Sequence, residues 1–196
     1  MYKSGKERFE KAGIDIYFPS KIEIEEDNNK IVVFRKALMC DVKSLYNLFS
    51  EYSKAGEMLP RSMIDIYVHL RDYYIAEIET EGEEGRGYEL VGACALSIVW
   101  ENLAEIRSLA VKKPYTRKRI GTELIRKCLI EANFFKISKI FALTYKPQFF
   151  IANGFKIIEK SELPHKIWSD CINCVKFPDC DETAVMFELE VNINIK

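Results

Sequence analysis

The sequence predicts one α/β domain with a mixed central sheet flanked by helices. Two apolar segments, 73–79 and 88–100, have the pattern of a hairpin whose loop is rich in glycine and glutamate. A strand at 103–111 follows after a short turn, and an amphipathic helix then leads to another apolar strand at 139–145. Strand, helix and strand in this order predict a right-handed parallel crossover. The sheet is therefore expected to combine antiparallel and parallel pairs.

The N-terminal part divides into a tail and the start of the domain. Residues 1–30 are polar and irregular, so we expect an appendage of uncertain structure there and the domain itself over 31–196. Segment 31–35 is an apolar first strand. Asp41 and Ser62 are placed to cap two helices, because short polar side chains accept hydrogen bonds from the first N–H groups of a helix. The residues expected to form the apolar stripe of the second helix are Ile64, Tyr67, Val68 and Leu70.

The C-terminal part continues the alternation of helices and strands. Pro147 begins a short helix. Late strands are expected at 155–159 and 183–191, on either side of a cysteine-bearing loop at 161–182. No repeat, low-complexity tract or interdomain linker interrupts this order, which supports one domain.

The overall composition excludes several classes of protein. With 48% hydrophobic residues, 30% charged residues and a net charge of −1, the chain matches an ordinary soluble globular protein. A nucleic-acid binder needs a concentrated basic surface, which this balance argues against. No apolar run has the length of a membrane span or a signal peptide, so we expect a cytoplasmic protein with no membrane partner. The oligomeric state is left open, a homo-oligomer included.

The most informative segment is 104–132, where an alternating strand leads into a helix through a basic turn. The N-terminus of a helix offers free N–H groups and a positive dipole end, which together bind anions. The segment therefore predicts a site for a phosphorylated cofactor, although a solvated loop is the alternative for such a run. The basic residues of the turn are Lys112, Lys113, Arg117, Lys118 and Arg119.

This order of elements resembles the GNAT acetyltransferases. Segment 108–125 takes the place of the family's pyrophosphate motif, in which Gln or Arg is followed by two residues, Gly, one residue, and Gly or Ala. Thr116, Arg119 and Gly121 stand at those three positions, so only the last is kept. The resemblance implies the GNAT acyl-CoA N-acyltransferase fold, with acetyl-CoA in a gap beside strand 103–111. The implied acetyl-CoA contacts are Leu109, Ala110, Val111, Thr116, Arg117, Lys118, Arg119, Ile120, Gly121 and Thr122.

A longer set of short sequence segments resembles the single-domain bacterial N-acetylglutamate synthases, which are GNAT enzymes. MLPRS, LAEIRSLAV, FALTY and FFIANGF occur in the same order, and the resemblance covers roughly residues 31–190. It implies transfer of acetyl from acetyl-CoA to the α-amine of L-glutamate in a ternary complex, the first step of arginine biosynthesis. Two alternatives stay open: a GNAT enzyme with another small amine acceptor, and a non-catalytic acyl-CoA-binding module.

The resemblance also assigns candidate catalytic groups. Glu105, expected on the same side of its strand as Arg107 and Leu109, matches a carboxylate that accepts the amine proton through water. A strand-edge glutamate paired with an arginine is the structural alternative. Backbone N–H groups of Leu109 and Val111 are expected to polarise the thioester carbonyl and to bind the pantetheine amide, while their side chains belong to the core.

The proton donor for the leaving thiolate is less defined. Many GNAT enzymes use a tyrosine four residues before the glycine of the Gly-Phe pair, and Phe150 stands at that position here. Thr144, at the end of the FALTY strand, is the substitute hydroxyl that the resemblance implies, with Tyr145 next. A thiolate can also leave without assistance, because a thiol pKa of about 8.5 makes it a fair leaving group.

A dicarboxylate acceptor requires cationic groups. Arg61, in MLPRS, matches the position of a glutamate-binding arginine, and Arg107 is the second candidate. A guanidinium binds a carboxylate through two parallel hydrogen bonds. The alternative for Arg61 is a helix-start arginine in solvent.

The cysteine-bearing loop raises the question of a metal. Cys171, Cys174 and Cys180 supply three soft ligands, and His165 is the candidate fourth ligand of a structural zinc site. A cluster of reduced thiols in a packed loop is the alternative, since a second Cys-x-x-Cys pair is missing.

Overall fold

One eight-stranded sheet organises the protein. The computed structural model describes residues 20–24, 30–82, 85–163 and 181–189. The strands are β1 (Ser20–Ile24), β2 (Lys30–Lys36), β3 (Tyr73–Gly82), β4 (Gly85–Trp100), β5 (Leu103–Val111), β6 (Lys139–Thr144), β7 (Lys156–Ile157) and β8 (Thr183–Glu188). Their order across the sheet is β1-β2-β3-β4-β5-β6-β8-β7. Strands β5 and β6 pair in parallel and the other neighbours are antiparallel, which confirms the predicted mixed sheet.

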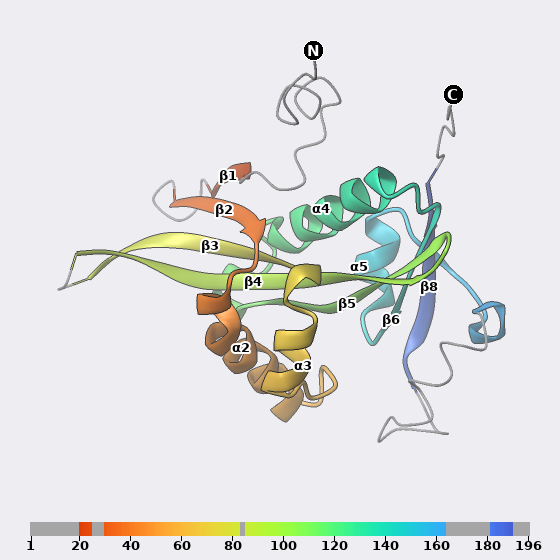
Figure 1. Cartoon of the computed structure of the whole chain (residues 1–196), viewed down its shortest axis with the longest axis horizontal. Coiled ribbons are helices and arrows are strands. Elements are labelled where there is room, and N and C mark those ends of the chain that lie inside the picture. The colour runs from red at the N-terminus through yellow and green to blue at the C-terminus, as the bar shows by residue number, and fades with distance from the viewer. Residues whose placement is uncertain (1–19, 25–29, 83–84, 164–180, 190–196) are drawn as a thin grey trace, which may run out of the picture.

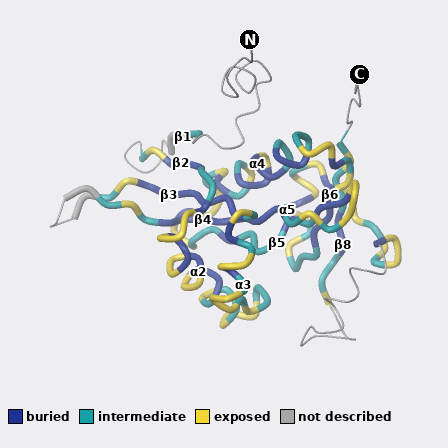
Figure 2. The backbone as a smooth tube through the Cα atoms, in the orientation of Figure 1, coloured by how far each residue is buried: buried dark blue, intermediate teal, exposed yellow. Residues whose placement is uncertain are grey.

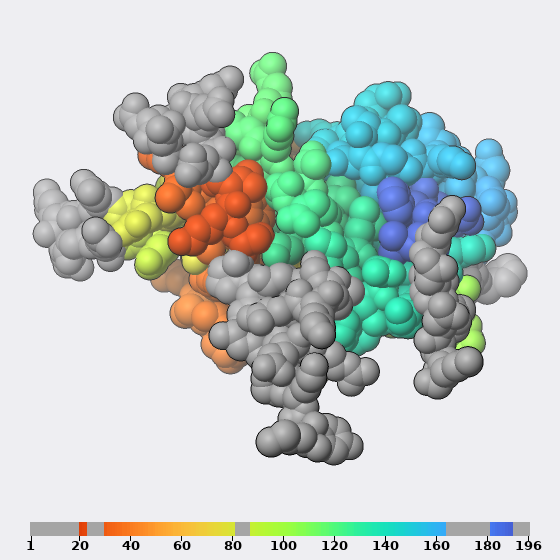
Figure 3. Space-filling view, turned by 90° about the horizontal axis from the view of Figure 1, so that it is seen from above, coloured from red at the N-terminus to blue at the C-terminus, as the bar shows by residue number. Residues whose placement is uncertain are grey.

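Helices cover both faces of this sheet (Figure 1). The helices are α2 (Val42–Lys54), α3 (Met63–Val68), α4 (Ile120–Phe134) and α5 (Pro147–Ala152). Helices α2 and α3 lie against one side, which we call the α2/α3 face. Helices α4 and α5 lie against the other, the α4 face. Seen from above in Figure 3, the green surface of α4 and its preceding turn lies between β2 and the blue β8.

Side-chain alternation along the strands builds a separate core on each face. In β3, Tyr74 and Ile78 belong to the cluster under α4, whereas Tyr73 and Ile75 belong to the cluster under α2 and α3. The buried segments in Figure 2 follow these central strands. A strand that is covered on both faces is apolar throughout, which explains the continuous hydrophobic runs of the sequence.

Helix α3 has the predicted cap but not the predicted apolar stripe. The Ser62 side chain accepts a hydrogen bond from the Asp65 N–H at 3.0 Å. Of the predicted stripe, Leu70 is buried just after the helix, whereas Ile64 is 75% exposed and Val68 71% exposed; within the helix it is Ile66 that is fully buried. The prediction placed the wrong side inward because a helix of six residues has too few turns for its periodicity to fix the buried side.

Two further elements differ from the sequence-based boundaries. Strand β1 lies inside segment 1–30 and pairs antiparallel with β2, from Ser20 opposite Phe34 onward. Its short apolar alternation was hidden by the charged residues on both sides. The late strand expected at 155–159 is reduced to the two residues of β7, which is the last strand of the sheet.

Candidate active site

Strands β5 and β6 pair over only three residues. Leu103, Ala104 and Glu105 lie opposite Lys139, Ile140 and Phe141, and within the described residues no pairing continues beyond them. Residues 106–111 of β5 and 142–144 of β6 are therefore not paired with each other, and we call the place where these two strands part, toward their carboxyl ends, the strand gap. Ligands of open α/β sheets bind beyond the carboxyl ends of strands, so this edge is a candidate site.

Glu105 and Arg107 lie beside the strand gap on the α2/α3 face. Arg107 is directly opposite Ala95, which packs in the core beneath α2 and α3. The Arg107 Nε lies 3.6 Å from a Glu105 carboxylate oxygen, and both side chains are about one-fifth exposed at 20% and 19%. The carboxylate and the guanidinium are therefore partly desolvated.

A β-bulge at Ser108 changes the direction of the following side chains. Arg107 pairs with Ala95 and Ala110 pairs with Ala93, so two β5 residues lie opposite one β4 residue. Ser108 has a φ of 52°, in the left-handed region. As a result, Leu109 packs on the α4 face. The expectation that Leu109 shares a side with Glu105 was wrong, because a bulge cannot be inferred from residue spacing.

Arg61 reaches this bulge from the start of α3. Its Nε donates a hydrogen bond to the Ser108 hydroxyl at 3.1 Å, and its Nη1 lies 3.7 Å from Asp65. The Ser108 side chain also hydrogen-bonds to Tyr73 of β3. Burial raises the pKa of Tyr73, while Ser108 and Arg61 act against this shift. Arg61, Arg107 and Glu105 thus lie on the same face of the sheet.

Backbone groups of β5 point into the strand gap. The Lys112 N–H donates to the Val91 carbonyl of β4 at 2.8 Å, so strand alternation directs Ala110 toward β4 and Val111 and Leu109 toward the gap. The Tyr52 hydroxyl of α2 donates to the Val111 carbonyl. The N–H groups expected to bind a thioester therefore have the required direction, but Ala110 does not present its backbone there.

The basic turn before α4 adopts a left-handed backbone at two arginines. Arg117 has a φ of 62° and Arg119, the N-cap of α4, a φ of 61°. Both side chains are exposed, as are Thr116 and Thr122. The first N–H groups of a fifteen-residue helix face this turn. Free N–H groups, the helix dipole and two exposed guanidinium groups make an anion site that suits a pyrophosphate.

Other residues of this segment have structural roles. Ile120, the first residue of α4, is buried against the sheet, and the Lys118 ammonium lies 5.8 Å from the Tyr115 ring centre. Gly121 is helical, and a Cβ there would come within 3.0 Å of the Phe149 ring of α5. The left-handed position of the motif is therefore Arg119, and Gly121 serves close helix packing.

Thr144 ends β6 on the other wall of the strand gap. Its Oγ1 accepts a hydrogen bond from the Lys146 N–H at 3.0 Å, which leaves the hydroxyl proton for another acceptor. Alternation from Ala142, which packs on the α4 face, places Thr144 on that face as well. Thr144 and Glu105 thus approach the gap from opposite sides of the sheet.

Comparison with known protein sequences identifies the family of this chain. The family model described as "Acetyltransferase (GNAT) family" matches residues 42–155, more than half of the chain. A Chlorobaculum tepidum protein named "Uncharacterized N-acetyltransferase CT2212" is 36% identical over 152 residues, which cover 78% of this chain and 93% of that protein. The chain belongs to the GNAT acetyltransferase family. The amino-acid acetyltransferase of Mycobacterium tuberculosis is 27% identical over 139 residues, or 70% of this chain and 76% of that protein.

Solved structures show the same GNAT fold. N-acetylglutamate synthase from Neisseria gonorrhoeae, complexed with coenzyme A and N-acetyl-glutamate, gives a TM-score of 0.68 at 23% identity. The match covers 81% of this chain but 35% of that protein, so this chain spans about a third of its length. Rv2747 from M. tuberculosis, complexed with CoA and NLQ, gives a TM-score of 0.64 at 22% identity over 80% of this chain and 98% of that one.

Membership in the GNAT family decides among the classes that the sequence left open. The protein is an acetyl-CoA-dependent N-acetyltransferase, and not a non-catalytic binding module. Phe150, which replaces the family tyrosine, is 4% exposed and packs edge-on against Phe149 and Phe155. Its ring belongs to the core between α5 and the sheet.

The predicted zinc ligands cannot be placed. His165, Cys171, Cys174 and Cys180 lie outside the described residues. The residues that the structure does describe contain no group of three or more His, Cys, Asp or Glu side chains suited to a metal ion. None of the described helices combines the length and apolar character needed to cross a membrane.

Three site residues were missed at the level of sequence. Ser108 and Tyr73 join the site through the bulge, and Tyr52 reaches the Val111 carbonyl from the inner side of α2. Both tyrosines occupy positions that periodicity assigns to the core, and a serine in a strand carries no signal of a left-handed backbone. No local pattern could have identified them.

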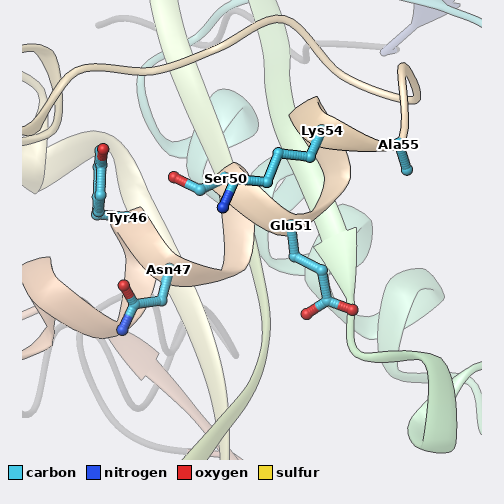
Figure 4. Close-up of a pocket in the computed structure, with 6 residues that line it drawn as sticks. All are labelled: Tyr46, Asn47, Ser50, Glu51, Lys54 and Ala55. Carbon is cyan, nitrogen blue, oxygen red and sulfur yellow. The ribbon is translucent and has the colours of Figure 1, made fainter.

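A surface hollow on α2 is separate from this site. Figure 4 shows its lining residues, Tyr46, Asn47, Ser50, Glu51, Lys54 and Ala55. They occupy the helix side opposite to the buried Leu45, Leu48 and Phe49. The hollow therefore faces away from the sheet and from the strand gap.

Proposed function

We propose that the protein transfers the acetyl group of acetyl-CoA to the α-amine of L-glutamate. The observation that carries this proposal is the pairing of Glu105 with Arg107 beside the strand gap, with Arg61 held on the same face. The Glu105 carboxylate can accept a proton from an ammonium group, and the two guanidinium groups can bind carboxylates. This combination suits an acceptor that carries both an ammonium and a carboxylate. The name of the M. tuberculosis relative, an amino-acid acetyltransferase, supports the same class of acceptor.

The cofactor would lie in the strand gap. Its pyrophosphate would bind the N-terminus of α4 with Arg117 and Arg119, and its thioester carbonyl would accept a hydrogen bond from the Leu109 or Val111 N–H. Two neighbours of the same fold were solved with coenzyme A, which supports acetyl-CoA as the co-substrate. The acetyl carbon would then face the α2/α3 face, where Glu105 lies.

The reaction would proceed by direct attack in the ternary complex. Glu105, acting through a water molecule, takes a proton from the acceptor ammonium, and the free amine attacks the thioester carbonyl carbon. The C–N bond forms as the carbonyl becomes an oxyanion that the β5 N–H groups stabilise. As the C–S bond breaks, the nitrogen gives up its second proton, which passes through solvent or the Thr144 hydroxyl to the leaving thiolate. The products are the N-acetyl amino acid and coenzyme A.

The acceptor would bind through its carboxylates. Arg61 and Arg107 would each bind one carboxylate oxygen pair, since a guanidinium matches this planar geometry. Under this assignment the protein takes part in the first step of arginine biosynthesis. The second candidate is a GNAT enzyme for another small amine, which the generic fold equally permits.

An acceptor survey tests this proposal. Coenzyme A release from acetyl-CoA would be measured with each of the twenty amino acids at equal concentration. We expect L-glutamate to give the highest kcat/KM. Release with a different amine acceptor alone would support the second candidate, and no release with any acidic amino acid would reject the glutamate assignment.

A further inference from the structure

A chain of hydrogen bonds crosses three elements on the α2/α3 face and ends at Arg61. Arg61 of α3 donates to the Ser108 hydroxyl at 3.1 Å, and Ser108 of β5 hydrogen-bonds to Tyr73 of β3. A hydroxyl that accepts from a guanidinium still has its own proton and a second lone pair, so it can bond to the phenol of Tyr73 as well. This series of hydrogen bonds therefore connects the Arg61 cation to a neutral, buried tyrosine.

This chain depends on the bulge. With the regular alternation of β5, the side chain after Arg107 would point to the α4 face. The left-handed φ of 52° at Ser108 turns its hydroxyl instead toward Arg61, so two consecutive polar side chains share one face. A left-handed backbone is costly for a residue other than glycine, and such strain is concentrated at functional sites.

Tyr73 is well placed to anchor the chain. Its side chain is 2% exposed and packs against Phe49 of α2, with ring centres 5.5 Å apart. In the sheet register it lies opposite Ala95, which lies opposite Arg107. A rigid phenol therefore contacts the Ser108 hydroxyl on one side and lies near the Arg107 charge on the other.

We propose that Ser108 and Tyr73 are positioning residues that hold the Arg61 guanidinium in place for the acceptor carboxylate. The proposal rests on the proposed function, because it deepens the acceptor side of that site. Arg61 uses its Nε for Ser108, and its Nη1 lies near Asp65, so the fork is fixed in orientation before the acceptor arrives. A preorganised arginine loses less entropy on binding and therefore raises acceptor affinity.

The first experiment measures both Michaelis constants with L-glutamate and acetyl-CoA for Ser108→Ala and Tyr73→Phe. We expect the KM for L-glutamate to rise about tenfold in Ser108→Ala and about threefold in Tyr73→Phe, in line with the loss of one hydrogen bond to a charged or neutral partner. The KM for acetyl-CoA and kcat should stay within about twofold. An unchanged L-glutamate KM, or a parallel rise in both constants, would overturn the proposal.

Two further variants separate positioning from folding. Ser108→Gly removes the hydroxyl but accepts the left-handed backbone without strain, so it should fold and still raise the L-glutamate KM. Tyr74→Phe removes the hydroxyl of the next residue of β3, which hydrogen-bonds to Glu131 on the α4 face. This control should leave the L-glutamate KM unchanged, and an equal rise there would indicate a general packing effect instead.

A double-variant cycle separates this inference from the proposed function. In an Arg61→Ala background, Ser108→Ala should have no further effect on the L-glutamate KM, because its role acts through Arg61. An additive rise would overturn positioning while keeping the acceptor site. If Arg61→Ala alone leaves the L-glutamate KM unchanged, or the wild-type protein shows no turnover, both the acceptor assignment and this inference are rejected.

Discussion

The two halves of the site, the acceptor side on the α2/α3 face and the basic turn before α4, differ in how their functional groups are held. On the α2/α3 face the functional side chains are partly buried and contact one another: Glu105 pairs with Arg107, and Arg61 bonds to Ser108. In the basic turn the arginines are exposed, although Arg117 and Arg119 share the left-handed backbone that Ser108 has on the α2/α3 face. A small acceptor is recognised by only a few contacts, so the side chains that bind it must be held in place. A large polyanion can instead be bound by backbone N–H groups and exposed positive charges.

Glu105→Gln is the largest expected change on the α2/α3 face. The amide keeps the shape of the side chain but cannot accept the amine proton, so kcat/KM for the acceptor should fall about 10² to 10⁴-fold. Acetyl-CoA binding, measured by calorimetry, should be unchanged because the strand gap and basic turn are untouched.

The matched control is Glu101→Gln at the exposed turn between β4 and β5. It changes the same charge on the same hairpin and should keep full activity. If Glu105→Gln retained more than about half of the wild-type rate, the carboxylate would be structural, held by Arg107, and the base would have to be sought elsewhere.

The stability of the protein at alkaline pH tests whether buried tyrosine and cysteine side chains on the two faces of the sheet keep their protons. Burial raises the pKa of Tyr73 on the α2/α3 face and of the Cys128 thiol on the α4 face, and burial also raises the pKa of Tyr52. The folded state then keeps protons that the unfolded chain releases, so stability is lost as pH rises above the unfolded values near 9 for the thiol and 10 for the tyrosines.

Urea unfolding between pH 8 and pH 10.5 measures this loss. A buried group such as Tyr73 or Cys128 that ionises only in the unfolded state lowers the free energy of unfolding by about 1.4 kcal/mol per pH unit, and the more exposed Tyr52 contributes less because solvent screens it. Cys128→Ala should remove the part that begins near pH 9. A free energy of unfolding that stays level over this range would show that these groups ionise in the folded protein as readily as in the unfolded chain.

Arg119→Gly tests the basic turn, where Arg119 combines a left-handed backbone with a positive charge expected to contact the cofactor phosphates. Glycine adopts the left-handed φ freely, but it also makes the unfolded chain more flexible. The net gain in unfolding free energy should therefore be small, under about 1 kcal/mol. The KM for acetyl-CoA should rise about threefold or more as a phosphate contact is lost.

Lys136→Gly is the control for this change. Lys136 has a φ of 62° just after α4, and it is exposed at the helix end opposite to the basic turn. It should give the same small gain in stability with no change in the KM for acetyl-CoA. A KM that is equal for Arg119→Gly and the wild type would mean that the Arg119 charge does not contact the cofactor.

The sequence predicted the fold well because its signals are local. The strand 103–111, the helix that begins at Ile120 and the cap at Ser62 all depend on periodicity or on a single side chain, and the structure confirms them. Strand β1 and the inward side of α3 were missed, since a few residues are too short a sample of either period.

The site was harder to predict because its arrangement is not local. Spacing along β5 assigned Leu109 to the side of Glu105, and the bulge at Ser108 reverses that assignment. The contact of Arg61 with Ser108 joins residues 47 positions apart, and no local pattern encodes it. Resemblance to a family brought Arg61, Glu105 and Thr144 together as candidates, while the supporting residues Tyr73 and Ser108 required the three-dimensional structure.

The central claim is that a carboxylate-bearing acceptor binds beside Glu105 through Arg61. Its most direct test is steady-state coenzyme A release with L-glutamate by the wild-type protein and Arg61→Ala, measured side by side. We predict turnover by the wild type, a KM for L-glutamate that rises at least about tenfold in Arg61→Ala, and an unchanged KM for acetyl-CoA. Equal L-glutamate constants for the two proteins would contradict the account.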